Sequence, residues 1–475
     1  MQGIRSRFRT ARTLLAMALA VALAACGATR TPHVRPDVQV PAQWSGIDAQ
    51  SGEIALDAWW VGMGDAGLER VIARALERNN DLAAATIRVR RAQLQADLAR
   101  NQFVPSVSAG ISTGASRRLD EGGASARSSS ASLSASYEVD LWNRLGSERD
   151  AAVWRAQATA EDRAATALAL IGTTAGLYWQ LAYLDQRIQA SLASIEVARQ
   201  TLEFVRVQYH AGAVSGLEVS DSEQNLASQR AAHASLEQQR TETRHAFAIL
   251  FDAPPDDIDM DPAPLSAAGL PPIAAGLPAD LLARRPDLRA AELRLRATLA
   301  DVHTTRASFY PRLSLTASAG SSSVALLDVL RNPVGSIGAA LSLPFLQFNQ
   351  MRLSTRISET QYEEAVVNFR QTLYQALADT ANALAARATL TERARLSAES
   401  LAAAQRSEDI VEVRYKAGAI ALRAWLDAQE RRRAAEIALV ESELARLNNQ
   451  VLVYQVLGGS IPSDAAMDPV QRNPP

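Results

Sequence analysis

Three glycines in the N-terminal part form the one pattern in this sequence that could bind a nucleotide cofactor. Gly62, Gly64 and Gly67 make a G-x-G-x-x-G, the spacing that holds a dinucleotide pyrophosphate where a parallel strand turns into a helix. Such a site also needs a second parallel strand and an acidic residue about 20 positions further on. Residues 68–78 lead instead into another helical stretch, 81–101. We therefore interpret the glycines as a turn before an amphipathic helix and expect no cofactor.

The other residues with catalytic or metal-binding chemistry do not form a pattern. No nucleophile motif or phosphate-binding loop is present in the sequence. The histidines show no ligand spacing; they are His33, His210, His233, His245 and His303. We expect neither an enzyme nor a metal site.

The single cysteine follows an export signal. Four arginines in residues 5–12, an apolar run at 14–22 and the small residues before Cys26 have the order of a secretory signal. The apolar run is too short to span a bilayer as a helix. Leu-Ala-Ala-Cys resembles a bacterial lipobox, in which the cysteine is lipidated, and Gly27 then implies sorting to the outer membrane. The alternative is a plain signal peptide with an incidental cysteine.

Composition argues against nucleic acid as a partner. The net charge of the 475 residues is −2, and the basic residues are spread along the chain. All of them are arginine except Lys416. One cysteine also excludes an intramolecular disulfide framework.

Long helices dominate the sequence. Between residues 145 and 252 there is no proline, strong helix formers prevail, and the helix-stopping residues are confined to 211–216. This predicts helices at 146–210 and 217–252. The first would be about 100 Å long, which exceeds any ordinary globular core.

The second half of the chain repeats the first at an offset of 206 residues. Tyr209, Gly212 and Asp221 recur as Tyr415, Gly418 and Asp427. Other landmarks keep the same spacing, which indicates a tandem duplication. The second repeat therefore predicts helices at 348–416 and 423–458.

Each repeat also contains two stretches with period-2 alternation of small polar and apolar residues. Such alternation over about ten residues is typical of transmembrane barrel strands, although one face of a soluble sandwich would alternate in the same way. The predicted strands lie at about 104–116, 130–142, 312–322 and 335–346. Four strands cannot close a barrel, because the smallest membrane barrels need about eight. Strands that enter a membrane would therefore require oligomerisation, since open edges leave unpaired backbone groups in lipid.

Several motifs carry a resemblance to a known family. They are Trp59-Trp60, the stretch from Tyr137 to Gly146, Arg284-Arg285-Pro286-Asp287, Leu343-Pro344-Phe345 and Leu426-Asp427-Ala428-Gln429. With Cys26, they resemble the TolC superfamily of outer-membrane factors, in its lipidated NodT/OprM-like branch. The resemblance implies an α+β membrane protein. Three chains would form a 12-stranded outer-membrane β-barrel, four strands per chain, continued by a long periplasmic α-helical barrel.

The resemblance divides the chain into a signal peptide, a lipid-anchored linker, two repeats joined by an equatorial linker, and a tail. The respective ranges are 1–25, 26–57, 58–252, 253–278, 279–459 and 460–475.

The function implied by the resemblance is the exit duct of a tripartite efflux pump in a Gram-negative bacterium. A homotrimer would export small molecules such as drugs, together with a periplasmic adaptor protein and an inner-membrane resistance-nodulation-division pump. The alternative from a different class is a lipid-anchored helical tether that does not conduct. Barrel-like strands favour the duct, because a tether needs only Cys26.

The resemblance also points to a gate at the helical tip. In the family, an aspartate that aligns with Asp427 forms the innermost ring of the closed channel. Three such carboxylates would raise one another's pKa and favour cations. Ala424 replaces a second family carboxylate, so we expect one acidic ring. Asp221 is a weaker candidate for the same rim, and Leu422 or Trp425 would add an apolar constriction. The alternative is that Asp427 is an ordinary solvated acid.

The two turns between the helices would contact the adaptor. Gly212 and Gly418 suit helix-ending turns that need positive φ. Tyr415 and Arg414 would hold the closed tip by hydrogen bonds. The expected contact residues are Gly212, Ala213, Val214, Gly418, Ala419 and Ile420.

Overall fold

The structure is a computed structural model that describes residues 36–44, 58–117, 119, 125–255, 262–266, 270–273, 276, 278–324, 328, 331 and 333–459. The predicted signal peptide, the predicted lipidation site Cys26 and the tail 460–475 lie outside these residues. The chain divides into two compact units. The first is built around Arg88–Ala160 and Ala290–Gln371, and the second around Gln39–Ile87, Glu161–Arg289 and Thr372–Pro475.

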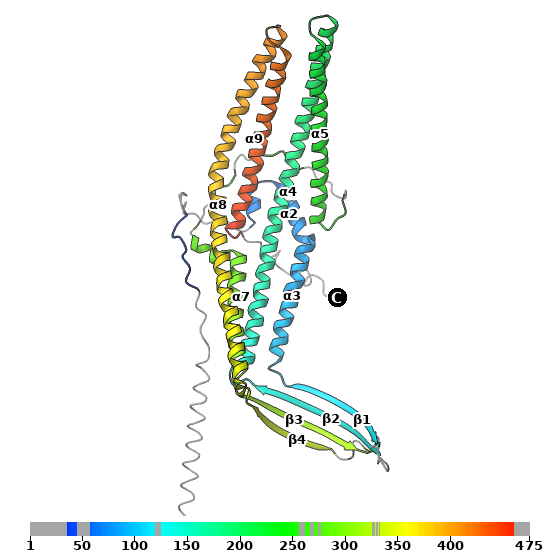
Figure 1. The fold of residues 1–475 in the computed structure, drawn as a ribbon, viewed down its shortest axis with the longest axis vertical. Coiled ribbons are helices and arrows are strands. Elements are labelled where there is room, and N and C mark those ends of the chain that lie inside the picture. Colours follow the sequence, from blue (N-terminus) through cyan, green and yellow to red (C-terminus); the bar gives the residue numbers. More distant parts are fainter. Residues whose placement is uncertain are drawn as a thin grey trace, which may run out of the picture. The chain divides into compact units, whose positions relative to one another are not determined.

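Both repeats use the same order of elements, except for an additional short 3-10 helix, η4, in the second (Figure 1). The first repeat has η1 (Trp59–Met63), α2 (Ala66–Arg78), α3 (Asn80–Asn101), β1 (Ser106–Arg117), β2 (Ser125–Val139), α4 (Arg144–His210) and α5 (Gly216–Leu250). The second has η2 (Pro278–Asp280), α6 (Leu281–Arg284), α7 (Pro286–Ala307), β3 (Arg312–Ser323), β4 (Val334–Ser342), η4 (Pro344–Leu346), α8 (Phe348–Lys416) and α9 (Leu422–Val456). The limits of α3 and α7, of β1 and β3, and of α5 and α9 differ by 206 residues at both ends, so the duplication is structural.

The glycine-rich stretch near the N-terminus is a turn, as we interpreted it. Residues Trp59–Met63 form a 3-10 helix, and Gly64 follows with φ 68°. Asp65 then caps α2, because its carboxylate accepts from the backbone N–H groups of Gly67 and Leu68 at 2.8 and 3.1 Å.

Two predicted strands end earlier in the structure than in the sequence-based prediction. Strand β2 stops at Val139 rather than near 142, because the Asp140 carboxylate accepts from the N–H groups of Leu145 and Gly146 at 3.2 and 2.8 Å. It thereby starts the next helix. Strand β4 stops at Ser342 rather than near 346, because Pro344 opens a 3-10 helix and has no N–H for a strand ladder.

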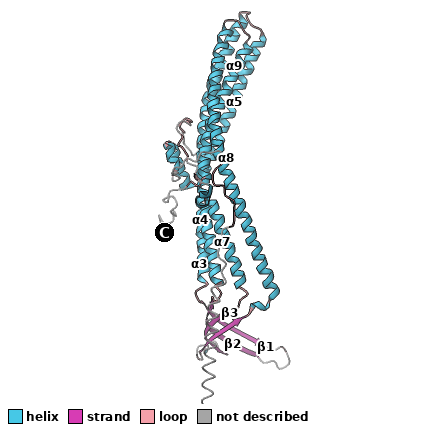
Figure 2. Cartoon of the chain, turned by 90° about the vertical axis from the view of Figure 1, so that its left-hand side faces the viewer, coloured by secondary structure: helices cyan, strands magenta, loops and turns pink. Residues whose placement is uncertain are grey.

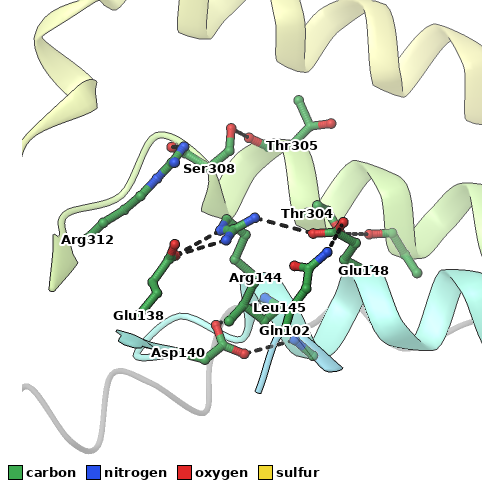
Figure 3. A network of polar contacts seen from close by, with 12 residues as sticks. Gln102, Glu138, Asp140, Arg144, Leu145, Glu148, Thr304, Thr305, Ser308 and Arg312 are labelled. Atoms are coloured by element: carbon green, nitrogen blue, oxygen red, sulfur yellow. Dashed lines mark hydrogen bonds and ion pairs between the residues drawn. The ribbon is translucent and has the colours of Figure 1, made fainter. Parts of the chain in front are cut away.

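A polar network joins strand β2 to the start of α4 (Figure 3). The Arg144 guanidinium lies between two carboxylates, 3.0 Å from Glu138 and 3.3 Å from Glu148. Gln102 donates to Glu148 from the end of α3 at 2.9 Å. Arg144 is 18% exposed, so these pairs are partly shielded from solvent. The network fixes the corner at which the sheet turns into the long helix.

The four strands form one antiparallel sheet in the order β1-β2-β3-β4 (Figure 1), and strands are drawn in magenta in Figure 2. Because side chains alternate across a strand, the two faces differ in chemistry. Serine hydroxyls lie about 2.7 Å apart across neighbouring strands on one face, in the pairs Ser106–Ser136, Ser108–Ser134, Ser112–Ser130 and Ser318–Ser336. The other face exposes large apolar side chains: Val107, Ile111, Leu133, Leu315, Ile337 and Leu341. The register thus separates a hydroxyl face from an apolar face, and β1 and β4 remain edge strands.

In each repeat, an equivalent hydrogen bond joins the residue before the first long helix to the end of the last helix. Asn79, which precedes α3, donates to the carbonyl of Leu250 at 3.3 Å. Arg285, at the corresponding position before α7, donates to the carbonyl of Val456 at 3.4 Å and to that of Ala376 at 3.3 Å. The C-terminal carbonyls of a helix have no partner within the helix, so these side chains supply one.

Among the described residues, no helix combines the length and the apolar character needed to cross a membrane.

Alanine substitution should destabilise the protein to different extents at two glycines that share a left-handed backbone. Gly418 and Gly458 have φ of +72° and +80°. A Cβ at Gly418 would meet open space, whereas one at Gly458 would lie 2.8 Å from the backbone carbon of Arg284. We expect Gly418→Ala to destabilise by about 1 kcal/mol, the usual cost of left-handed φ, and Gly458→Ala to destabilise by more. Apparent melting temperatures of both variants test this, and equal losses would contradict the proposed backbone clash.

Candidate functional site at the helical tip

The two hairpin turns have the same backbone structure. In the first, Gly212 donates to the carbonyl of Tyr209 at 3.0 Å and Ala213 to that of Gln208 at 2.9 Å. In the second, Gly418 and Ala419 bond in the same way to Tyr415 and Arg414, at 2.8 and 2.9 Å. This is the Schellman arrangement, which needs positive φ at the glycine. Gly212 and Gly418 have φ of +74° and +72°.

The two helices that follow the tip turns, α5 and α9, begin differently. We call them the return helices. At α5, the Ser215 hydroxyl accepts from the N–H of Leu217 at 3.2 Å, and the Glu218 carboxylate accepts from the N–H of Ser215 at 3.1 Å. This is a capping box. At α9, the corresponding residue is Ala421, which has no side chain that could cap. An uncapped start is less stable by about 1 kcal/mol, so the tip of the second hairpin is held less firmly by its own backbone.

A small apolar core holds the two hairpins together at the tip. Val205 of α4 packs with Tyr415, Leu422 and Trp425 of the second hairpin. Leu422 is 2% exposed and Trp425 is 6% exposed. We predicted that one or the other of these side chains would add an apolar constriction to a pore. The structure places both inside the core of the tip, so we assign them to packing.

Tyr415 connects the hairpins by its ring and by its hydroxyl. The ring stacks on Trp425, with centroids 5.2 Å apart, and meets Phe204 edge-on at 6.2 Å. The hydroxyl donates to the side-chain oxygen of Gln208 on α4 at 3.0 Å. Burial raises the pKa of Tyr415, and the negative charge of Glu218 raises it further. The phenol therefore stays protonated and able to donate at neutral pH.

The other residues assigned to the tip by sequence are mostly at its surface. Arg414 is exposed and contributes its backbone carbonyl to the turn. The exposed turn residues are Gly212, Ala213, Gly418 and Ala419. Val214 and Ile420 are partly buried and pack against the tip core.

Asp427 and Asp221, proposed from sequence for one rim, line the same cleft between α9 and α5. The cleft has a volume of about 270 Å³. Asp427 is about half exposed, and its carboxylate lies 3.2 Å from the guanidinium of Arg423. Glu430 and Arg433 also line the cleft and form an ion pair of 2.6 Å.

Sequence analysis missed two residues beside these acids. Arg423 precedes Asp427 by four positions, and Leu217 precedes Asp221 by four positions. Both are well exposed, at 74% and 68%. The spacing of four puts each pair on one helix face, and the 206-residue offset makes Arg423 the counterpart of Leu217. Both signals were present in the sequence.

This chain is similar in sequence and structure to known proteins. A model of the outer membrane efflux protein family matches residues 71–250 and 277–459. The pyoverdine export outer membrane protein OpmQ of Pseudomonas aeruginosa is 32% identical over 453 residues, which cover 93% of this chain and 95% of the relative. Outer membrane protein OprJ of the same species is 30% identical over 458 residues, covering 94% and 95%. The open-state structure of the MtrE outer membrane channel of Neisseria gonorrhoeae superposes with a TM-score of 0.81 at 27% identity, covering 90% of this chain and 97% of that one.

A four-stranded sheet combined with two long helical hairpins in each chain defines an outer-membrane channel. The chain belongs to the outer membrane efflux protein family. This confirms the family and the fold class predicted from sequence. Members of the family are channels, which confirms the prediction of a protein that is not an enzyme.

Removal of the Tyr415 hydroxyl should change the dynamics of the tip measurably. Tyr415→Phe keeps the ring stacking and removes the bond to Gln208, which contributes about 1 kcal/mol. We expect amide exchange in residues 205–215 and 411–425 to rise about fivefold. Tyr209→Phe is the matched control, because Tyr209 is the repeat counterpart and is about half exposed. Equal effects of the two variants would show that the bond does not hold the tip.

Proposed function

We propose that this protein is the exit duct of a tripartite efflux pump, open to the exterior through a shared barrel and gated at the periplasmic tip. Family membership supports an outer-membrane efflux channel. The main support for the shared barrel and the gate is the combination of a four-stranded sheet that has exposed edges with two hairpins that end in a charged cleft.

The sheet supports a trimer. Its apolar face suits lipid and its hydroxyl face suits a water-filled lumen. Among the described residues, strands β1 and β4 each have a free edge, and free edges in lipid leave backbone groups unpaired at a cost of several kcal/mol each. Three chains would supply 12 strands and pair every edge. We therefore place the apolar face in the outer membrane and the hydroxyl face in the lumen.

The hairpin ends support the gate and the adaptor contact. In a trimer, Asp427 and Asp221 would face the axis from three copies of the tip cleft, while Tyr415 and its bond to Gln208 would hold neighbouring hairpins closed. Opening would move the second hairpin, whose return helix lacks a cap. The exposed turns at Gly212 and Gly418 would meet a periplasmic adaptor protein, which links the duct to an inner-membrane resistance-nodulation-division pump.

The cargo would be small molecules. OpmQ is named for pyoverdine export, and by this similarity we include molecules such as pyoverdine with drugs among the candidate substrates. Lipidation at Cys26 would anchor the mature chain beside the barrel.

Native mass spectrometry of the detergent-extracted protein tests the duct. We expect a trimer in which each chain carries acyl mass at Cys26, and ion currents when the same sample is added to a planar bilayer. A monomer or dimer that persists across detergents and carries no current would overturn the duct and favour a lipid-anchored tether. A trimer with no acyl mass would contradict the anchor alone.

Neutralising the acidic rim tests the gate. Asp427→Asn removes the carboxylate but keeps the side-chain size, so we expect a higher single-channel conductance if Asp427 helps to narrow the closed tip. Asp97→Asn is the control, because Asp97 is an exposed, arginine-paired aspartate on α3. An unchanged conductance in Asp427→Asn would remove Asp427 from the gate.

A further inference from the structure

The tip cleft contains both signs of charge. Three carboxylates line it (Asp221, Asp427 and Glu430) together with two guanidiniums (Arg423 and Arg433). Its net formal charge is therefore −1 per chain. Without Arg423 it would be −2, so a single side chain halves the negative charge of the cleft.

The two arginines are not equivalent in position. Arg433 is 12% exposed and is paired with Glu430 at 2.6 Å. Arg423 is 74% exposed and lies one helical turn closer to the start of α9 than Asp427. Four residues of helix rise about 6 Å. An ion or substrate that approaches from the tip turn would meet Arg423 before it meets Asp427.

The first repeat shows that this arrangement is particular to the second hairpin. Leu217 occupies the position of Arg423, one turn before Asp221, and is 68% exposed. Asp221 therefore has no cation one turn before it on its own helix. Arg423 is therefore an exposed basic residue of the second hairpin that the first hairpin lacks at the equivalent position.

We propose that Arg423 determines the charge selectivity of the channel entrance. In the trimer of the proposed function, on which this inference rests, three Arg423 side chains form a cationic ring outside the acidic ring of Asp427. The paired rings weaken the preference for cations that an acidic ring alone would impose. The entrance then admits anionic as well as cationic small molecules, and an anionic chelator is one class that benefits.

Ion selectivity in planar bilayers tests the role of Arg423. Reversal potentials in a KCl gradient at about 0.1 M salt give the ratio of cation to anion permeability, and charges remain effective over about 10 Å at this ionic strength. We expect Arg423→Gln to raise the ratio roughly threefold, because each chain loses one positive charge in the cleft. Arg423→Lys keeps the charge and should leave the ratio near that of the wild type.

Three further variants separate selectivity from a structural role. Leu217→Arg and Asp427→Asn each make the cleft less negative, so both should lower the ratio. The double variant Arg423→Gln with Asp427→Asn restores the net charge of −1 and should restore the ratio. A purely structural ion pair would not give opposite shifts or a restored ratio.

Lys416→Gln is the matched control for charge at the tip. Lys416 is exposed at the end of α8 and pairs with Glu412 at 2.6 Å, outside the cleft. We expect Lys416→Gln to change the permeability ratio by less than half as much as Arg423→Gln does. If Lys416→Gln changed the permeability ratio as much as Arg423→Gln, or if Arg423→Gln left the ratio unchanged, the role of Arg423 would be overturned. The protein would still be a conducting duct. Absence of current in every variant and in the wild type would overturn the proposed function as well.

Discussion

Unpaired backbone at the edges of a four-stranded sheet is the constraint on which the rest of the structure depends. Strands β1 and β4 have one partner each within the chain, and the other sides of their backbones need hydrogen bonds. In the proposed duct this sheet lies in the outer membrane, where water cannot supply them. In the proposed trimer, closure with further copies of the chain would satisfy these edges.

Gene duplication provides this architecture, and divergence between the repeats provides its chemistry. Asn79 and Arg285 occupy equivalent positions and both bond to the last carbonyls of a return helix. At the tip, equivalent positions have different roles. Tyr415 is buried and joins the hairpins, whereas its counterpart Tyr209 is about half exposed. The repeats thus agree in the contacts of the framework and differ in the contacts that join the hairpins at the tip.

The same divergence explains the division of charge at the tip. A small core of Val205, Tyr415, Leu422 and Trp425 brings the hairpins together. This contact sets the cleft in which Asp221 and Asp427 lie. Because Trp425 packs inward, the exposed positions at the start of the return helices are left to Leu217 and Arg423. An apolar side chain and a basic one thus occupy matching places in the two halves of one rim.

Local patterns determined much of this protein. Helix propensity, the lack of proline and glycine-containing turns located α4, α5, α8 and α9 to within two residues, because such signals act along the chain. The 206-residue offset established the duplication, and strand counting required an oligomer. Strand ends were less predictable, because a carboxylate at Asp140 and a proline at 344 end β2 and β4 for reasons that alternation does not contain.

Only the tertiary structure decided which tip residues face inward. From the sequence, Leu422 or Trp425 was predicted to constrict a pore, yet both pack against α4, which lies some two hundred residues earlier in the chain. The pairing of Arg423 with Asp427 was accessible from their spacing, but the shared cleft with Asp221 was not. Periodicity along one helix defines its faces, whereas the neighbour that covers a face is set by packing between distant segments.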